Sequence, residues 1–263
     1  MERLYFIAVA VLALWVGVWG YFIPAEVTKA LPFEVPPLHA RFLGAVYLSG
    51  FAIPSLSIVS NRWTNIRDVP VMTAIWTGGL GLISLLHLEA FPSARAQPWV
   101  WFGAYLVYPL IALWLAWRHR GDQADPSGTV LPPWAKGSLL AQGVVFVILS
   151  GMLLLLPGVM VGQWPWPITR MLAQIYSAPL LAYGVGSLLL ARRRSWQEIL
   201  VPVVGMLVFA VLVLVASAIH RSLFSSSEAV DVIWFAVVAA ISASLAVLGA
   251  RALAARRSVA PSR

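Results

Sequence analysis

The sequence has 263 residues, of which 60% are hydrophobic and 11% are charged, and its formal net charge is +8. A soluble domain usually has about 25% charged residues, whereas this chain places its apolar residues in blocks of about 20, the length of a membrane-spanning helix. We therefore expect an integral membrane protein without a nucleic-acid partner, because the positive charges lie between the apolar blocks. The absence of cysteine excludes disulfides, iron–sulfur clusters and cysteine nucleophiles.

The apolar blocks predict an all-α membrane protein with eight transmembrane helices. The blocks cover residues 4–23, 41–59, 69–88, 98–117, 138–156, 171–190, 199–219 and 230–250. The polar stretch 118–137 contains Gly and Pro and is expected to be a loop between two groups of four helices. The predicted units are therefore a four-helix repeat at 1–117, a linker at 118–137, a second repeat at 138–251 and a basic tail at 252–263.

The distribution of positive charge predicts the orientation in the bilayer. One side of the predicted bundle has thirteen of the eighteen Lys and Arg residues and the other side has five. Cytoplasmic loops are the ones enriched in Lys and Arg, so both termini and the linker are expected to face the cytoplasm. The high content of Ala, Leu, Val, Arg and Trp is typical of a bacterial plasma membrane, and the lipid bilayer is the expected environment.

An internal repeat relates the two groups of helices. The segment Ser84–Phe102 aligns without a gap with Ser217–Phe235, 133 residues later, and seven of the nineteen positions are identical. Pro24 and Pro157 are separated by the same 133 residues. Four helices return the chain to the same side of the membrane, so the two copies should be parallel, related by a pseudo-twofold axis along the membrane normal.

Prolines are expected to shape several of the helices. Pro70 and Pro202 are predicted to start the third helix of each group, where a missing N–H costs least. Pro54, Pro109 and Pro179 lie inside apolar blocks and are expected to kink the helices that contain them.

Repeated polar and aromatic residues gather at the predicted outer end and form a candidate ligand-binding site. They are His87, His220, Arg41, Arg170, Tyr47, Tyr176, Trp101 and Trp234. Ionisable residues at membrane depth are expensive and point to function, so we expect an outward-facing, pseudo-symmetric pocket. The alternative is that the arginines extend to the headgroups and the histidines cap helix C-termini, with no pocket between them.

Three classes of function are compatible with this pattern. The first, which the repeat and the outer charges favour, is binding or transport of an amphipathic or anionic small molecule, through charge-assisted hydrogen bonds. The second is a redox subunit that holds a haem between histidines, or a quinone, for a partner in a membrane complex. The third is a structural or assembly subunit without a ligand.

Catalytic and metal-binding motifs are not visible in the sequence. It contains no Gly-x-Ser-x-Gly, His-Glu-x-x-His or phosphate-binding loop, so an enzyme is not the expected reading. A zinc site would need three or four converging ligands. The two remaining histidines, His39 in the first outer loop and His119 in the linker, are expected to be solvated.

Overall fold

The computed structural model describes residues 2–33, 35–60, 62–122, 128–224 and 229–258, and these residues form nine α-helices and no β-strand. The helices are α1 (Glu2–Phe22), α2 (Pro37–Ile58), α3 (Val69–Leu86), α4 (Ala96–Arg118), α5 (Pro133–Leu155), α6 (Pro157–Gln163), α7 (Arg170–Ala191), α8 (Trp196–Ile219) and α9 (Ala229–Ser258). Four short 3₁₀-helices join them: η1 (Pro24–Lys29), η2 (Trp63–Asn65), η3 (Leu88–Ala90) and η4 (Arg221–Leu223).

Eight of these helices are long and apolar enough to cross a membrane, which by length and composition marks a multi-pass membrane protein. The prediction of eight helices with the length and composition of membrane spans is confirmed. The ninth helix, α6, is a seven-residue helix in the connection between α5 and α7. Helix α9 continues through Ser258, past Arg251, so the first part of the predicted basic tail is helical.

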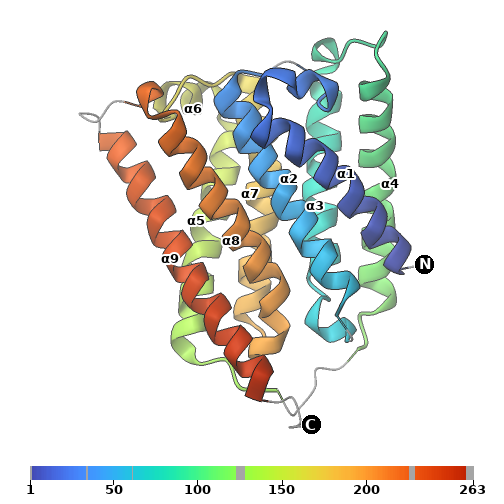
Figure 1. The fold of residues 1–263 in the computed structure, drawn as a ribbon, viewed down its shortest axis with the longest axis vertical. Helices are drawn as coiled ribbons and strands as arrows, with labels where there is room; N and C mark the ends of the chain where they lie inside the picture. The colour runs from blue at the N-terminus through green and yellow to red at the C-terminus, as the bar shows by residue number, and fades with distance from the viewer. Residues whose placement is uncertain (1, 34, 61, 123–127, 225–228, 259–263) are drawn as a thin grey trace.

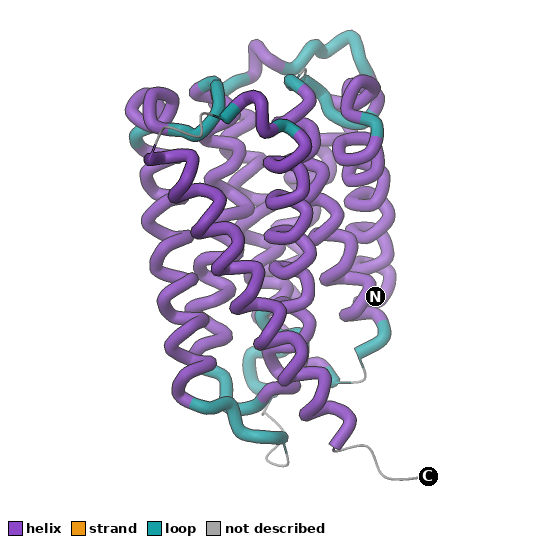
Figure 2. Tube along the Cα trace, turned by 60° about the vertical axis from the view of Figure 1, so that its left-hand side comes forward, coloured by secondary structure: helices purple, strands orange, loops and turns teal. Residues whose placement is uncertain are grey.

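The helices form one bundle, in which successive long helices run in opposite directions (Figure 1). Helices α1, α3, α5 and α8 run toward the upper end of Figure 1, and α2, α4, α7 and α9 run toward the lower end. We call the connecting residues 23–33, 35–36, 87–95, 156–169 and 220–224 the upper end, and the connecting residues 59–60, 62–68, 119–122, 128–132 and 192–195 the lower end. Figure 2 shows the same arrangement from another side, with the C-terminal end of α9 at the bottom.

The helices pack in pairs that correspond between α1–α4, the first group, and α5–α9, the second group. Helix α1 packs on α2 as α5 packs on α7, and α3 packs on α4 as α8 packs on α9. The two groups meet through α2 with α8 and through α3 with α7. We call these two interfaces the α2–α8 seam and the α3–α7 seam. Helices α4 and α9 are the least buried and lie at opposite edges of the bundle (Figure 1).

Glycines allow the first pair of helices in each group to approach closely. A Cβ on Gly20 of α1 would stand 2.9 Å from the carbonyl oxygen of Ala40 in α2. A Cβ on Gly44 would overlap the backbone of α1 at Tyr21. In the second group, a Cβ on Gly184 of α7 would stand 2.9 Å from the backbone nitrogen of Val147 in α5. Small residues of this kind let helix backbones pack against each other in a membrane.

The start of α8 corrects one prediction. Helix α8 begins at Trp196, so Pro202 lies inside it and does not start it. Ser195 and Glu198 form a capping box that satisfies the first N–H groups one turn and a half before the proline. Pro70 does lie in the first turn of α3, and Pro54, Pro109 and Pro179 lie inside α2, α4 and α7, respectively.

Two ion pairs join the groups at the lower end, and each group contributes the arginine of one pair and the carboxylate of the other. Arg67, before α3, pairs with Glu198 of α8. Arg193, before α8, binds Asp68 at the N-terminus of α3 through two nitrogens, with Nε 2.8 Å from Oδ2. The side chains of Asp68 and Glu198 are 4% and 3% exposed. Arg67 and Arg193, which were counted above among the positive charges on one side of the predicted bundle, therefore also hold the two groups together.

Candidate functional site

The repeated tryptophans make the same hydrogen bond in both groups. Nε1 of Trp101 in α4 donates to Oγ of Ser84 in α3 at 2.8 Å. Nε1 of Trp234 in α9 donates to Oγ of Ser217 in α8 at 3.0 Å. Each bond joins the upper ends of the third and fourth long helices of its group. Both ends of the repeated segment are thus used for local packing.

Aromatic rings complete a matching cluster around each tryptophan. The ring centroids of Phe91 and Phe102 are 5.2 Å apart, and those of Phe224 and Phe235 are 5.1 Å apart, both at 52°. The side chains of Phe33 and Trp166, also 133 positions apart, meet Trp101 and Trp234 edge to face. We call these the first and second aromatic clusters. They hold the connecting loops against the helix ends.

His220 lies at the upper end of the α2–α8 seam. It is the C-cap residue of α8, and its Nε2 is 2.5 Å from Nη1 of Arg41 in the first turn of α2. A guanidinium only donates hydrogen bonds, so His220 accepts at Nε2 and is neutral. Arg41 is half-buried, and next to it the Tyr21 hydroxyl of α1 donates to the Leu212 carbonyl of α8 at 2.8 Å.

His87 occupies the corresponding place in the α3–α7 seam but has a different partner. It is the C-cap residue of α3, and its Nε2 is 2.7 Å from Oε1 of Gln174 in α7. The Gln174 amide nitrogen donates to the Leu154 carbonyl at 3.1 Å. Arg170, the first residue of α7, is exposed and lies over Gly158 of α6. The two histidines thus belong to different seams, each held by the other group of helices.

His39 corrects a sequence expectation, because it is buried and not solvated. Its side chain is 3% exposed, in the first turn of α2. Nδ1 lies 2.7 Å from the hydroxyl of Tyr176, and Nε2 lies 2.9 Å from the carbonyl oxygen of Pro167. Tyr176 also stacks on Phe42 at 4.0 Å between ring centroids. The contact with a loop from the other group removes His39 from water, which a search within one loop cannot reveal.

His119 is also not free in solvent. Its ring stacks on Trp63 at 4.0 Å, its Nε2 is 2.8 Å from Glu2, and its Nδ1 is 2.9 Å from Asp122. It thereby ties the end of α4 to the start of α1 at the lower end.

Two crevices at the upper end lie in corresponding places in the two groups. The first crevice, about 210 Å³, has walls from α1, α2 and α4. The second crevice, about 220 Å³, has walls from α5, α7, α8 and α9. Eight positions in the first lining recur 133 residues later in the second: Leu12 and Val145, Val16 and Leu149, Ala30 and Gln163, Tyr47 and Leu180, Gln97 and Val230, Val100 and Ile233, Trp101 and Trp234, Tyr105 and Val238.

The two crevices differ in polarity. Lys29, Gln97 and the hydroxyl pair of Tyr47 and Tyr105 belong to the lining of the first crevice. Apart from its two tryptophans, the second crevice has only Gln163 as a polar lining side chain. Lys29 is more than half exposed and is 3.0 Å from Glu26. The first crevice therefore offers a positive charge and hydroxyl groups, and the second is almost wholly apolar.

A wider groove of about 790 Å³ opens between α3 and α4. A Cβ on Gly81 would stand 3.1 Å from the carbonyl oxygen of Tyr105, so α3 and α4 touch at this level. Large apolar side chains line the groove between the two helices. The positions that correspond to Gly78 and Gly81 are Val211 and Leu214, which carry side chains. The groove therefore lies in the first group, and the positions that correspond to its glycines in the second group are occupied by side chains.

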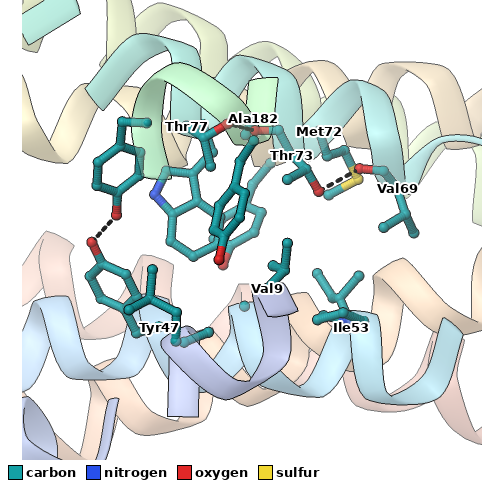
Figure 3. Close-up of a pocket in the computed structure, with 16 residues that line it drawn as sticks. Val9, Tyr47, Ile53, Val69, Met72, Thr73, Thr77 and Ala182 are labelled. Carbon is teal, nitrogen blue, oxygen red and sulfur yellow. Dashed lines mark hydrogen bonds between the residues drawn. The ribbon is translucent and has the colours of Figure 1, made fainter. Parts of the chain in front are cut away.

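A small cavity of about 40 Å³ lies deeper in the bundle, between the helices of the first group and α7 (Figure 3). Thr73 and Thr77 lie across it from Tyr47, Val9 and Ile53. The two threonine hydroxyls donate to the carbonyls of Val69 and Thr73. The cavity has room for a few waters at most, by the usual minimum of about 10–15 Å³ for one water. Tyr47 and Tyr105, whose hydroxyls are in contact, line both this cavity and the first crevice, so the two spaces are neighbours.

The eight predicted site residues are therefore divided among several places. Trp101, Trp234 and Tyr47 line the crevices, while none of the four cavities above includes His87, His220, Arg41 or Arg170 in its lining. Within the described ranges, no three His, Asp or Glu side chains are placed to hold a metal ion. Gln174, which the sequence reasoning missed, lies 133 residues after Arg41, and that spacing was the available signal.

Comparison of the chain with protein-family models, with curated proteins and with solved structures gives no match.

Proposed function

We propose that the protein binds an amphipathic molecule with a hydrocarbon chain, taken from the outer leaflet of the plasma membrane, in the first and second crevices. The correspondence of the two linings, eight positions at a constant spacing of 133, carries this proposal. Each crevice is lined by the tryptophan of a Trp–Ser hydrogen bond, and tryptophan suits the boundary between hydrocarbon and headgroups. Mostly apolar walls with a few polar groups are typical of ligand pockets.

The proposal includes the duplication and the orientation. The matching helix pairs, the Trp–Ser bonds and the aromatic clusters support two parallel copies of a four-helix unit. The excess of Lys and Arg at the lower end supports a cytoplasmic location for that end, so the crevices open toward the outer leaflet. Lys29 favours an anionic head group in the first crevice, although Glu26 offsets part of its charge.

The redox alternative receives less support from the geometry. The Nε2 atoms of His87 and His220 contact Gln174 and Arg41 in different seams. Ligation of one haem by both histidines would require both contacts to break. A quinone remains within the proposed class, because it combines a polar ring with an apolar chain.

Photolabelling tests the proposal. The protein would be placed in vesicles of phosphatidylethanolamine and phosphatidylglycerol that contain a diazirine-bearing fatty acid, and the adducts mapped by mass spectrometry. We expect adducts on the crevice linings, lost from the first crevice in Leu12→Trp and from the second in Val145→Trp, because each new indole fills its crevice. A matched fatty alcohol should label the first crevice more weakly than the acid.

Matched controls exist in the same two helices. Val11 and Val144 are 64% and 44% exposed, precede the two crevice residues and lie outside the crevice linings. Val11→Trp and Val144→Trp should leave the labelling unchanged. Adducts spread evenly over the lipid-facing helices and insensitive to all four substitutions would reject the proposal and favour a structural or assembly role.

A further inference from the structure

The two seams use their histidines with opposite hydrogen-bond directions. In the α2–α8 seam, Arg41 donates to Nε2 of His220, so this contact needs a neutral imidazole. In the α3–α7 seam, the Leu154 carbonyl holds the amide nitrogen of Gln174, which turns Oε1 toward His87. His87 therefore donates from Nε2, and a protonated imidazole can make the same bond.

We propose that acid opens the upper end of the α2–α8 seam and leaves the α3–α7 seam closed. A proton on Nε2 of His220 removes the acceptor and places an imidazolium beside the Arg41 guanidinium, so attraction becomes repulsion. A proton on Nδ1 of His87 faces the Glu89 carboxylate, whose oxygen lies 3.6 Å away, and favours the existing arrangement. The protein thus has one acid-sensitive contact and one acid-tolerant contact at corresponding positions.

The groups around His220 support a titration below neutral pH. Arg41 faces it from α2 and Tyr21 lies beside Arg41 from α1. Arg221, the next residue, turns away to the Phe224 carbonyl and the Phe235 ring. Asp231 of α9 is buried and has no hydrogen-bond partner among the residues that the structure describes. Burial first, and the Arg41 charge second, lower the pKa of His220 below its usual value of 6.5.

The sign of the effect follows from this lowered pKa. Above pH 6.5 the imidazole is neutral in both the folded and the unfolded chain, and the contact contributes fully. As the pH falls below that value the unfolded chain binds a proton more readily than the folded one, so stability decreases. The contact is lost as the pH falls through the lowered pKa.

The seam adjoins the second crevice, which links the acid response to ligand release. Phe42, next to Arg41, and Val213 of α8 both belong to the lining of this crevice. Separation of α2 from α8 at the upper end would move these two lining residues apart and widen the second crevice. This consequence rests on the proposed function, whereas the acid sensitivity of the seam does not.

Spin-label distances test the seam itself, and the absence of cysteine makes the labelled sites unique. One double-cysteine variant, Ala25→Cys with Leu223→Cys, labels exposed residues of η1 and η4 on either side of the α2–α8 seam. The other, Leu88→Cys with Val159→Cys, labels exposed residues of η3 and α6 beside the α3–α7 seam. Between about pH 7.5 and about pH 5, we expect the first distance to lengthen reversibly and the second to stay constant.

His220→Gln separates this titration from other acid effects. Its amide oxygen can accept from Arg41 and does not titrate, so the distance across the α2–α8 seam should stay short at both pH values. His87→Gln should retain the wild-type acid response. A constant α2–α8 distance in the wild type, equal lengthening of both seams, or an unchanged acid response in His220→Gln would each overturn the inference.

The diazirine fatty acid then tests the link to binding. At about pH 5, labelling of the second crevice should fall several-fold relative to the first crevice in the wild type and persist in His220→Gln. Crevice labelling that ignores pH would overturn the link to ligand release. If neither crevice is labelled at any pH while the spin-label distance responds to acid, the proposed function fails and the acid-sensitive seam stands.

Discussion

The upper ends of the two groups share their aromatic clusters but not their polar contacts. Trp101 and Trp234 make the same bond to a serine, and the two phenylalanine pairs have nearly the same geometry. By contrast, His220 binds an arginine and His87 binds a glutamine. The difference teaches that the residues shared by the two groups mainly serve local packing. The chemical behaviour of each shared histidine depends on a partner in the other group, and the two partners differ.

The tyrosines of the two groups also make different contacts. Tyr47 shares a hydroxyl contact with Tyr105 within the first group. At the spacing of 133, Leu180 stands in the second group where Tyr47 would be, and Tyr176 instead binds His39 across the two groups. One tyrosine thus makes a contact within a group, and the other joins the groups.

The largest expected effect on stability concerns the lower end, where an arginine of each group pairs with a carboxylate of the other group. Arg193→Ala would leave the Asp68 carboxylate buried without its guanidinium, and loss of one partner of a buried pair costs about 3–5 kcal/mol. Thermal unfolding in detergent, followed by circular dichroism, should show a large decrease in midpoint temperature. Arg192→Ala, at an exposed neighbouring residue, is the control and should have little effect. Equal effects of the two substitutions would show that the pair does not hold the groups together.

A smaller effect should follow from disturbing the close helix pair of the first group. Gly44→Ala would drive a methyl group into the backbone of α1, and overpacking of this kind costs about 1–3 kcal/mol. Gly151→Ala in α5 is the matched control, because a Cβ there meets no atom within 4 Å and alanine favours the helix by up to about 1 kcal/mol. The two variants should shift the unfolding temperature in opposite directions. A neutral Gly44→Ala would contradict the close approach of α1 and α2.

The smallest effects sharpen the comparison of the aromatic clusters. Trp101→Phe and Trp234→Phe each remove one indole hydrogen bond, worth about 1 kcal/mol. Trp101 is 5% exposed and Trp234 is only partly buried, so the loss should be larger at Trp101. Double-mutant cycles with Ser84→Ala and Ser217→Ala, measured by thermal unfolding, give the coupling energy of each pair. A coupling energy of zero in either cycle would show that the hydrogen bond of that Trp–Ser pair does not stabilise the protein.

Periodicity and composition were enough to predict the helices but not all of their boundaries. Blocks of about 20 apolar residues indicate spans because an unpaired backbone group is too costly in hydrocarbon. The start of α8 at Trp196 was missed because the capping box of Ser195 and Glu198 has a stronger local effect than Pro202. Helix α6 was missed because it is a short helix in a loop rich in proline and tryptophan.

The sequence by itself determined the membrane class, the eight spans and the residues that recur at a spacing of 133, because these depend on local composition and on positions along the chain. Only the tertiary structure decided which side chains meet. His39 is buried because Tyr176 and Pro167 come from the other group, and the two histidines differ because their partners lie on helices far away in sequence. A hydrogen-bond direction needs both partners, and one stretch of sequence contains only one of them.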